Sequence, residues 1–120
     1  MPFIIARVNV PVSTTQEAEI KTRMARAIEL VPGKNESYLM LSIEDNYRFY
    51  LRGDGSQKAA YIEASIFGNE DHAGFDAFAS ATTEIFYQVL GIPPENIYIK
   101  FDDIKAWSVG GAFIDRNRYR

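Results

Sequence analysis

LMLSIED, residues 39–45, has a counterpart 58 residues further along the chain in IYIKFDD, residues 97–103. The same offset aligns FYLRG, residues 49–53, with WSVGG, residues 107–111. It also superimposes six identical pairs, Ile4/Ile62, Ala6/Ala64, Val31/Val89, Gly33/Gly91, Asp45/Asp103 and Gly53/Gly111. Two copies of one supersecondary unit explain this pattern. We predict an internal repeat, residues 2–58 and 60–116, within a single domain of residues 1–120.

Each copy has the pattern of a strand, a helix and a second strand. β-branched and aromatic residues, which suit a pleated surface, predict strands at residues 3–10, 38–45, 61–67 and 96–102. The first helix is expected to start near Ser13, with Ser13 and Gln16 or Thr14 and Glu17 as its capping box, and to end at Gly33. Apolar residues at helical spacing predict a second helix from Phe75 to Val89, with Gly91 as its stop signal.

The fold class follows from these units. A strand–helix–strand unit within one sheet gives a parallel pair joined by a right-handed crossover. Two units predict an α/β fold, α+β in some schemes, with a four-stranded mixed sheet and two helices on one of its faces. Alternation predicts which apolar side chains meet the helices: Ile4, Ala6, Val8, Leu39, Leu41, Ile43, Ile62, Ala64, Ile66, Ile97, Ile99 and Phe101.

The opposite face of the predicted sheet mixes apolar and charged residues, among them Arg7, Glu63, Tyr98 and Lys100. Parallel strands rarely leave a face exposed to water. We therefore expect another copy of the chain to cover this face. The short segments 47–51 and 106–109 are candidates for extending a neighbour's sheet edge.

Composition excludes several classes of function. The net charge of −3 gives no general attraction to nucleic acid or to acidic membranes. There is no cysteine and only one histidine, His72, so neither thiol chemistry nor a histidine-rich metal site is expected. No apolar run has membrane-spanning length and no signal peptide is recognised, which predicts a cytoplasmic protein. The basic cluster at residues 116–120 is interpreted as a solvated tail.

The chain starts with MPFII, in which a proline directly follows Met1. Proline has no amide N–H, so it is tolerated as the first residue of a strand. A chemical interpretation is also open, because removal of Met1 would turn Pro2 into a chain-terminal secondary amine, which is a base. While Met1 is attached, the nitrogen of Pro2 belongs to a peptide bond and has no basicity.

Several motifs together resemble the tautomerase superfamily, and within it macrophage migration inhibitory factor and D-dopachrome tautomerase. They are MPFII, PGKNESYL at 32–39, ASIFG at 64–68, PPENIYIKF at 93–101 and SVGG at 108–111. The resemblance implies a homotrimer with one active site at each subunit junction and no cofactor. It also implies keto–enol tautomerisation of a small carboxylic acid, a 2-keto acid such as phenylpyruvate, with the N-terminal proline as general base and acid.

The resemblance also implies the residues of the site. Pro2 matches the catalytic proline, while Lys34, Ile66 and Tyr98 match substrate-binding positions, with Tyr98 reaching in from the adjacent subunit. Lys100 stands where relatives have asparagine or arginine, and is a further candidate for substrate binding. Apolar surroundings and nearby cations lower the pKa of an amine, so the lysines would both tune the base and attract a carboxylate.

Two alternatives stay open from the sequence. One is a cytokine-like signalling or binding protein with vestigial catalysis, although the Cys-x-x-Cys linked to thiol redox activity is absent. The other is a hydratase or dehalogenase that uses the same proline as an acid. Such relatives need an arginine and a glutamate near the proline, for which Arg7 and Glu63 are the candidates.

Overall fold

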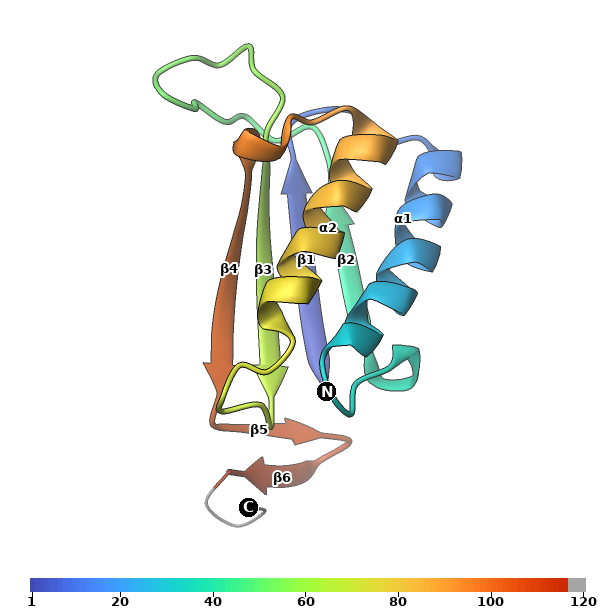
Figure 1. Ribbon diagram of the computed structural model, residues 1–120, viewed down its shortest axis with the longest axis vertical. Helices are drawn as coiled ribbons and strands as arrows, with labels where there is room; N and C mark the ends of the chain where they lie inside the picture. The colour runs from blue at the N-terminus through green and yellow to red at the C-terminus, as the bar shows by residue number, and fades with distance from the viewer. Residues whose placement is uncertain (117–120) are drawn as a thin grey trace.

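A four-stranded mixed sheet with two helices on one face forms the body of the molecule in the computed structural model (Figure 1), which describes residues 1–116. The strands are β1 (Pro2–Val8), β2 (Met40–Glu44), β3 (Ala60–Phe67) and β4 (Ile97–Ile104), in the order β2-β1-β3-β4. Strands within each unit are parallel, whereas β1 and β3 pair in antiparallel fashion. The predicted fold class is confirmed.

Helix α1 (Thr14–Ala27) starts as predicted, at a capping box formed by Ser13 and Gln16. It ends earlier than predicted, in a 3₁₀ turn, η1 (Ile28–Leu30), ahead of Gly33. The reason is Pro32, which disfavours a helical conformation at Val31; that residue is extended, with φ −88° and ψ 118°.

Helix α2 (Phe75–Leu90) ends at Gly91, as the sequence predicts, with a φ of 72°. Two further 3₁₀ turns, η2 (Glu36–Tyr38) and η3 (Pro94–Asn96), precede β2 and β4. The side chain of Asn35 accepts a hydrogen bond from the amide of Ser37 and so caps η2. Strand β2 therefore begins at Met40 rather than at residue 38.

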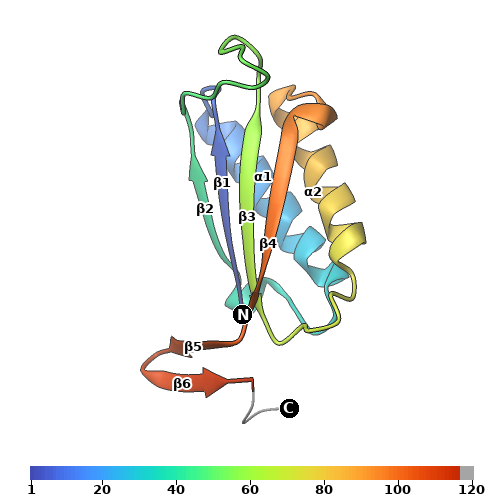
Figure 2. The same ribbon diagram turned by 90° about the vertical axis from the view of Figure 1, so that its left-hand side faces the viewer.

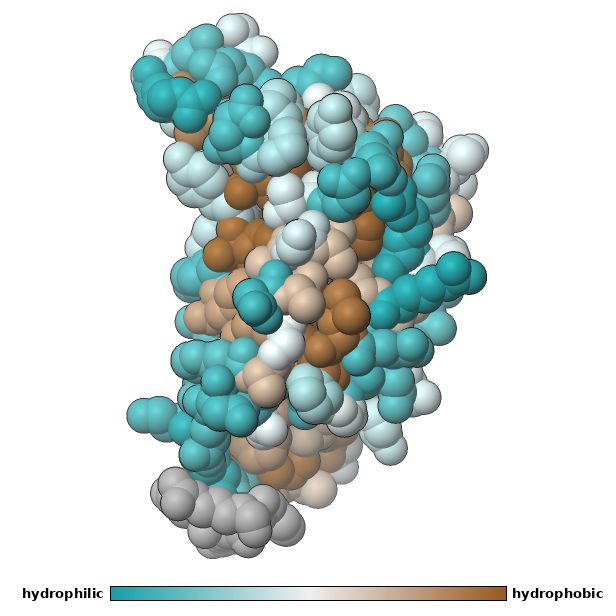
Figure 3. Space-filling view, viewed as in Figure 1, coloured by the Kyte–Doolittle hydropathy of each residue, from teal (hydrophilic) through white to brown (hydrophobic). Residues whose placement is uncertain are grey.

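The core lies between the sheet and the helices, where strand alternation placed it. Every side chain predicted to meet the helices is buried there or packs against the buried cluster. Phe78 and Phe86 of α2 are fully buried, and Phe75 stacks on Phe101 with ring centroids 4.7 Å apart. Burying a side chain of this size contributes about 1.5–3 kcal/mol. From the helix side, hydrophilic residues cover the outer surface of α1, while hydrophobic residues show between the two helices (Figure 3).

A β-hairpin, β5 (Ala106–Val109) and β6 (Ala112–Asp115), follows the sheet. Its turn residues Gly110 and Gly111 both have positive φ, 60° and 81°, as a two-residue hairpin turn of type I′ requires. The hairpin lies beyond the end of the sheet, close to the N-terminus (Figures 1 and 2). The segment 106–109 thus pairs within its own chain.

The predicted solvated tail, residues 116–120, falls largely outside the described residues, since 117–120 are not among them. At Arg116 the prediction is wrong, because this side chain is only 13% exposed and forms ion pairs. Across residues 1–116, no helix combines the length and apolar character needed to span a membrane.

Candidate active site at the start of strand β1

Three candidate residues gather where β1 begins and β3 ends. Pro2 is buried as the first residue of β1 and lies opposite Ile66 of β3 in the antiparallel register. Lys34 follows η1, and its Nζ donates a hydrogen bond of 2.7 Å to the carbonyl of Phe67. This bond directs the ammonium group across the end of β3 toward the start of the chain.

The amine at this end of the chain has an altered basicity. The pKa of the Met1 α-amino group is lowered from an ordinary 8.0 to about 6, mainly by burial and in addition by the positive charge and hydrogen bonding of nearby Lys34. An ammonium group loses hydration when buried and is repelled by a second cation, so both effects favour the neutral amine. The Met1 amine is therefore mostly unprotonated at neutral pH.

A cleft of 340 Å³ opens beside this amine. Its lining is predominantly apolar and comes from the chain start, η2, β2 and the hairpin: Met1, Pro2, Phe3, Tyr38, Met40, Trp107, Ser108, Val109 and Gly110. A larger cavity of 570 Å³ lies between α1 and β2, but its charged lining consists of Glu17 and the paired Lys21 and Glu36. The smaller cleft is the candidate site, because it contains the amine with the lowered pKa.

Ile66 lies next to Pro2 but is oriented away from the cleft. Its side chain is fully buried in the core on the helix side of the sheet. Only the main chain of Ile66 is therefore positioned to contact a molecule bound at Pro2. Alternation had already assigned this side chain to the core, and the antiparallel register with Pro2 brings its backbone to the site.

Tyr98 and Lys100 are not brought to Pro2 within one protomer. Through β3, Tyr98 is level with Arg7 and Lys100 with Ile5. Five residues separate Pro2 from the level of Tyr98, a distance of about 17 Å along the strand. Both side chains lie on the open face of the sheet, and Tyr98 is 55% exposed.

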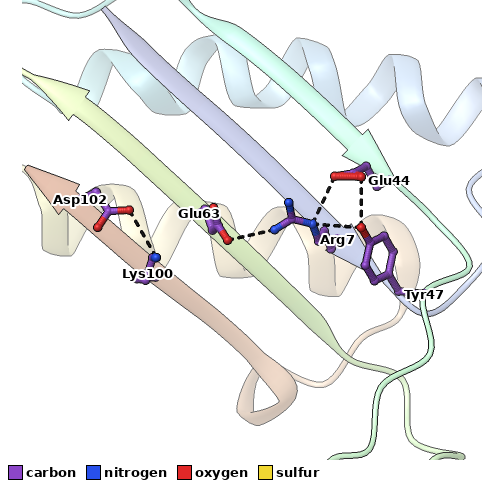
Figure 4. Close-up of polar contacts among 6 residues, drawn as sticks. All are labelled: Arg7, Glu44, Tyr47, Glu63, Lys100 and Asp102. Carbon is purple, nitrogen blue, oxygen red and sulfur yellow. Dashed lines mark hydrogen bonds and ion pairs between the residues drawn. The ribbon is translucent and has the colours of Figure 1, made fainter. Parts of the chain in front are cut away.

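Charged residues pair with one another on this open face (Figure 4). The guanidinium of Arg7 lies 2.9 Å from Glu63 and 3.2 Å from Glu44, on the two strands that flank β1. The Tyr47 hydroxyl donates to Glu44 and accepts from Arg7. Lys100 lies 3.5 Å from Asp102, whose carboxylate is the main cause of a raised pKa of Lys100.

Sequence reasoning missed part of the cleft wall. Met40, Trp107 and Gly110 of the hairpin turn line the cleft. Phe113 of β6 lies across from Ser108 and is not among the lining residues. The available signal was the hairpin itself: the only tryptophan precedes a Gly-Gly turn in AWSVGG. Within residues 1–116, no group of three or more histidine, aspartate or glutamate side chains is arranged to hold a metal ion.

Solved structures share this fold over almost the whole chain. MIF2 of Leishmania major superimposes with a TM-score of 0.86 at 21% identity, covering 95% of this chain and 97% of that one. A macrophage migration inhibitory factor homologue from Prochlorococcus marinus gives 0.81 at 25% identity, covering 92% and 97%. Pt0534, solved after inactivation by 2-oxo-3-pentynoate, gives 0.84 at 12% identity, covering 98% and 99%. No curated protein sequence matches the chain significantly.

The doubled β-α-β sheet, with a proline at the start of its first strand, places the chain in the tautomerase superfamily. The family model of macrophage migration inhibitory factor (MIF) matches residues 1–113. The chain belongs to the MIF family, which is known for phenylpyruvate and dopachrome tautomerase activity.

Proposed function

We propose that the protein is a keto–enol tautomerase of small 2-keto acids such as phenylpyruvate, with the amine of Pro2 as its base after removal of Met1. The observation that carries the proposal is the environment of the chain-terminal amine: burial and Lys34 lower the pKa of the Met1 amine to about 6, and removal of Met1 would leave the amine of Pro2 at the same end of β1. Pt0534, which shares the fold, is inactivated by a 2-keto acid, 2-oxo-3-pentynoate.

The reaction transfers one proton from carbon to oxygen. The neutral Pro2 amine removes a proton from C3 of the keto acid, and the electron pair of the C–H bond moves to the C2 oxygen as an enolate. The protonated Pro2 amine then gives this proton to the oxygen, which forms the enol and restores the neutral amine; the reverse sequence gives the ketone. Lys34 is proposed to bind the carboxylate and to stabilise the negative charge of the enolate. Its ammonium group lies close enough to the chain-terminal amine to lower the pKa of that amine, which supports this role. The step needs no cofactor.

A homotrimer completes the proposed site. Tyr98 and Lys100 lie about 17 Å and 10 Å along the strands from Pro2, too far to act on the same molecule within one protomer. Their position on the exposed open face suits contact with a neighbouring subunit. In the assembly, Tyr98 and Lys100 of one subunit would reach the cleft of the next, which is lined by that subunit's Pro2. Lys34 and the main chain of Ile66 lie beside this end of the cleft. The cytoplasm remains the compartment proposed from the sequence.

The hydratase or dehalogenase alternative requires Arg7 and Glu63 near the proline. The two side chains instead pair with each other on the open face, and Arg7 also pairs with Glu44. Within one protomer, this arrangement leaves neither side chain beside Pro2, which favours tautomerisation over the alternative.

The direct test is an assay of phenylpyruvate tautomerisation with protein whose intact mass shows that Met1 is absent. We expect Pro2→Gly to lower kcat/KM by up to about 10²-fold, because it replaces a rigid secondary amine by a primary amine on a mobile residue, and misplacement of a catalytic group costs that much. Lys21→Ala is the matched control, because it removes a lysine from an exposed pair with Glu36, and neither residue lines the cleft. Full activity of Pro2→Gly, or of protein that retains Met1, would contradict the mechanism.

A further inference from the structure

The hairpin that supplies Trp107, Ser108, Val109 and Gly110 to the cleft lies outside the sheet. Strand β6 pairs with β5 and not with any strand of the sheet. Figure 2 shows both strands beyond the end of the sheet, with β6 on the far side of β5. Because the hairpin does not pair with the sheet, its cleft-lining residues have a defined position only if other contacts hold the hairpin against the rest of the protein.

Arg116 provides this connection. The residue directly follows β6, and its amide donates a hydrogen bond of 2.8 Å to the carbonyl of Lys105, which closes the open end of the hairpin. Its Nε lies 2.9 Å from Oε1 of Glu70, in the loop between β3 and α2. Its second terminal nitrogen bonds Oδ1 of Asp103 on β4. One guanidinium therefore joins three separate segments.

The loop that holds Glu70 also borders Lys34. It begins at Phe67, whose carbonyl accepts the hydrogen bond of Lys34, and continues through Gly68, where an added Cβ would lie 3.5 Å from the lysine Nζ. Arg116 thus connects the aromatic wall of the cleft to the segment that positions the substrate-binding lysine. The rigid, planar fork of an arginine is pre-organised to contact two carboxylates at once, whereas the ammonium of lysine is a compact charge on a flexible stem.

We propose that Arg116 is a positioning residue that holds the Trp107 wall of the cleft at its working distance from Pro2 and Lys34. Arg116 lies beyond residues 1–113, which the MIF family model matches. The effect on catalysis rests on the proposed tautomerase function, whereas the effect on the position of the hairpin does not.

Trp107 makes the test direct, because it is the only tryptophan of the chain and its indole nitrogen is buried. We expect Arg116→Ala to shift the emission of Trp107 to the red and to increase its quenching by acrylamide. With phenylpyruvate as substrate, KM should rise roughly tenfold while kcat changes little; misplacement of a positioning group can cost up to about 10²-fold. Arg116→Lys should give intermediate values of emission, quenching and KM, because an ammonium group replaces only some of the contacts that the guanidinium makes with the two carboxylates.

Arg23→Ala is the matched control, because it truncates an arginine that pairs with Glu19 and Gln88 on the helix side of the molecule. Its emission and KM should equal those of the unaltered protein. If Arg116→Ala fails to fold, Asp103→Asn decides the question by removing one carboxylate with little change of shape. Unchanged emission and quenching in the folded variants would overturn the proposal. If the unaltered protein has no tautomerase activity but Arg116→Ala shows the expected emission shift, the positioning role of Arg116 stands and only the proposed function is refuted.

Discussion

The two β-α-β halves of the chain have the same backbone features at positions 58 residues apart. Gly33 and Gly91 each follow the helical segment of their half, with φ of 77° and 72°. Arg52–Gly53 and Gly110–Gly111 each form a turn with positive φ at both residues. A single bridge, Leu51 to Asp54, flanks the first turn, and a full hairpin flanks the second. The scaffold is shared almost to the last turn.

The chemistry is not shared. Strand β1 begins at Pro2 beside a chain-terminal amine, while β3 begins at Ala60 in the middle of the chain. Lys34 of the first half corresponds to Ile92 of the second, which is fully buried. One half therefore places a cation next to an amine, and the other places an apolar side chain in the core. The two halves together build the sheet. The candidate site depends on residues of the first half that have no equivalent in the second, Pro2 and Lys34 at the start of β1.

The largest effect is expected where the halves touch, at Gly74. It precedes α2 with a φ of 79°, and an added Cβ would lie 2.2 Å from the carbonyl oxygen of Leu30 at the end of η1. Gly74→Ala should lower the free energy of unfolding by about 3 kcal/mol, from backbone strain of about 1–2 and overpacking of about 1–3. Urea unfolding followed by circular dichroism measures this.

Gly53→Ala separates the two contributions, since Gly53 has the same φ of 79° and no atom within 4 Å of the added Cβ. It should show the backbone strain alone. Equal losses for the two variants would mean that the contact with Leu30 is unimportant and that the halves are not locked together at this point.

The next effect concerns the unmatched lysine. Lys34→Met makes the first half resemble the second by replacing the cation with an apolar side chain of similar length. We expect kcat/KM for phenylpyruvate to fall roughly 30-fold, or about 2 kcal/mol, the contribution of a hydrogen bond to a charged group. The loss should be mainly in KM, because the lysine is proposed to bind the carboxylate.

The pH profile of Lys34→Met tests separately whether Lys34 lowers the pKa of the proposed catalytic amine. In the proposed mechanism the neutral amine is the active form, and burial and Lys34 lower the pKa of a chain-terminal amine at this end of β1, as they do for Met1. Activity of the unaltered protein should therefore fall at acidic pH. Without Lys34 the pKa should rise toward 8.0, and the acid limb should move to higher pH. Burial, the larger cause of the lowered pKa, remains in the variant, so the pKa of the amine should stay below its ordinary value of 8.0. An unmoved acid limb would show that Lys34 does not tune the base.

Sequence reasoning predicted the shared scaffold better than the unmatched site. Alternation in the strands identified the core, because a side-chain period of two leaves no choice of face once one face is apolar. The same reasoning assigned Ile66 to the core, while the family resemblance assigned it to the site; the structure allows both, through the side chain and the main chain respectively. Trp107 and Arg116 were missed, because their positions depend on how the hairpin folds back past the end of the sheet, which has no periodicity in the sequence.

The smallest effect, and the closest comparison, comes from Gly33→Ala and Gly91→Ala. Both positions have the left-handed backbone that disfavours a side chain, and neither added Cβ would lie within 3.4 Å of another atom. Each variant should therefore lose a similar free energy of unfolding, about 1–2 kcal/mol, measured by thermal or urea unfolding. Their activities should differ, because Gly33 directly precedes Lys34 and strain there displaces the ammonium group, whereas Gly91 precedes the buried Ile92. We expect a lower kcat/KM for Gly33→Ala and an unchanged value for Gly91→Ala. Equal losses of activity would mean that the halves share the site as well as the scaffold.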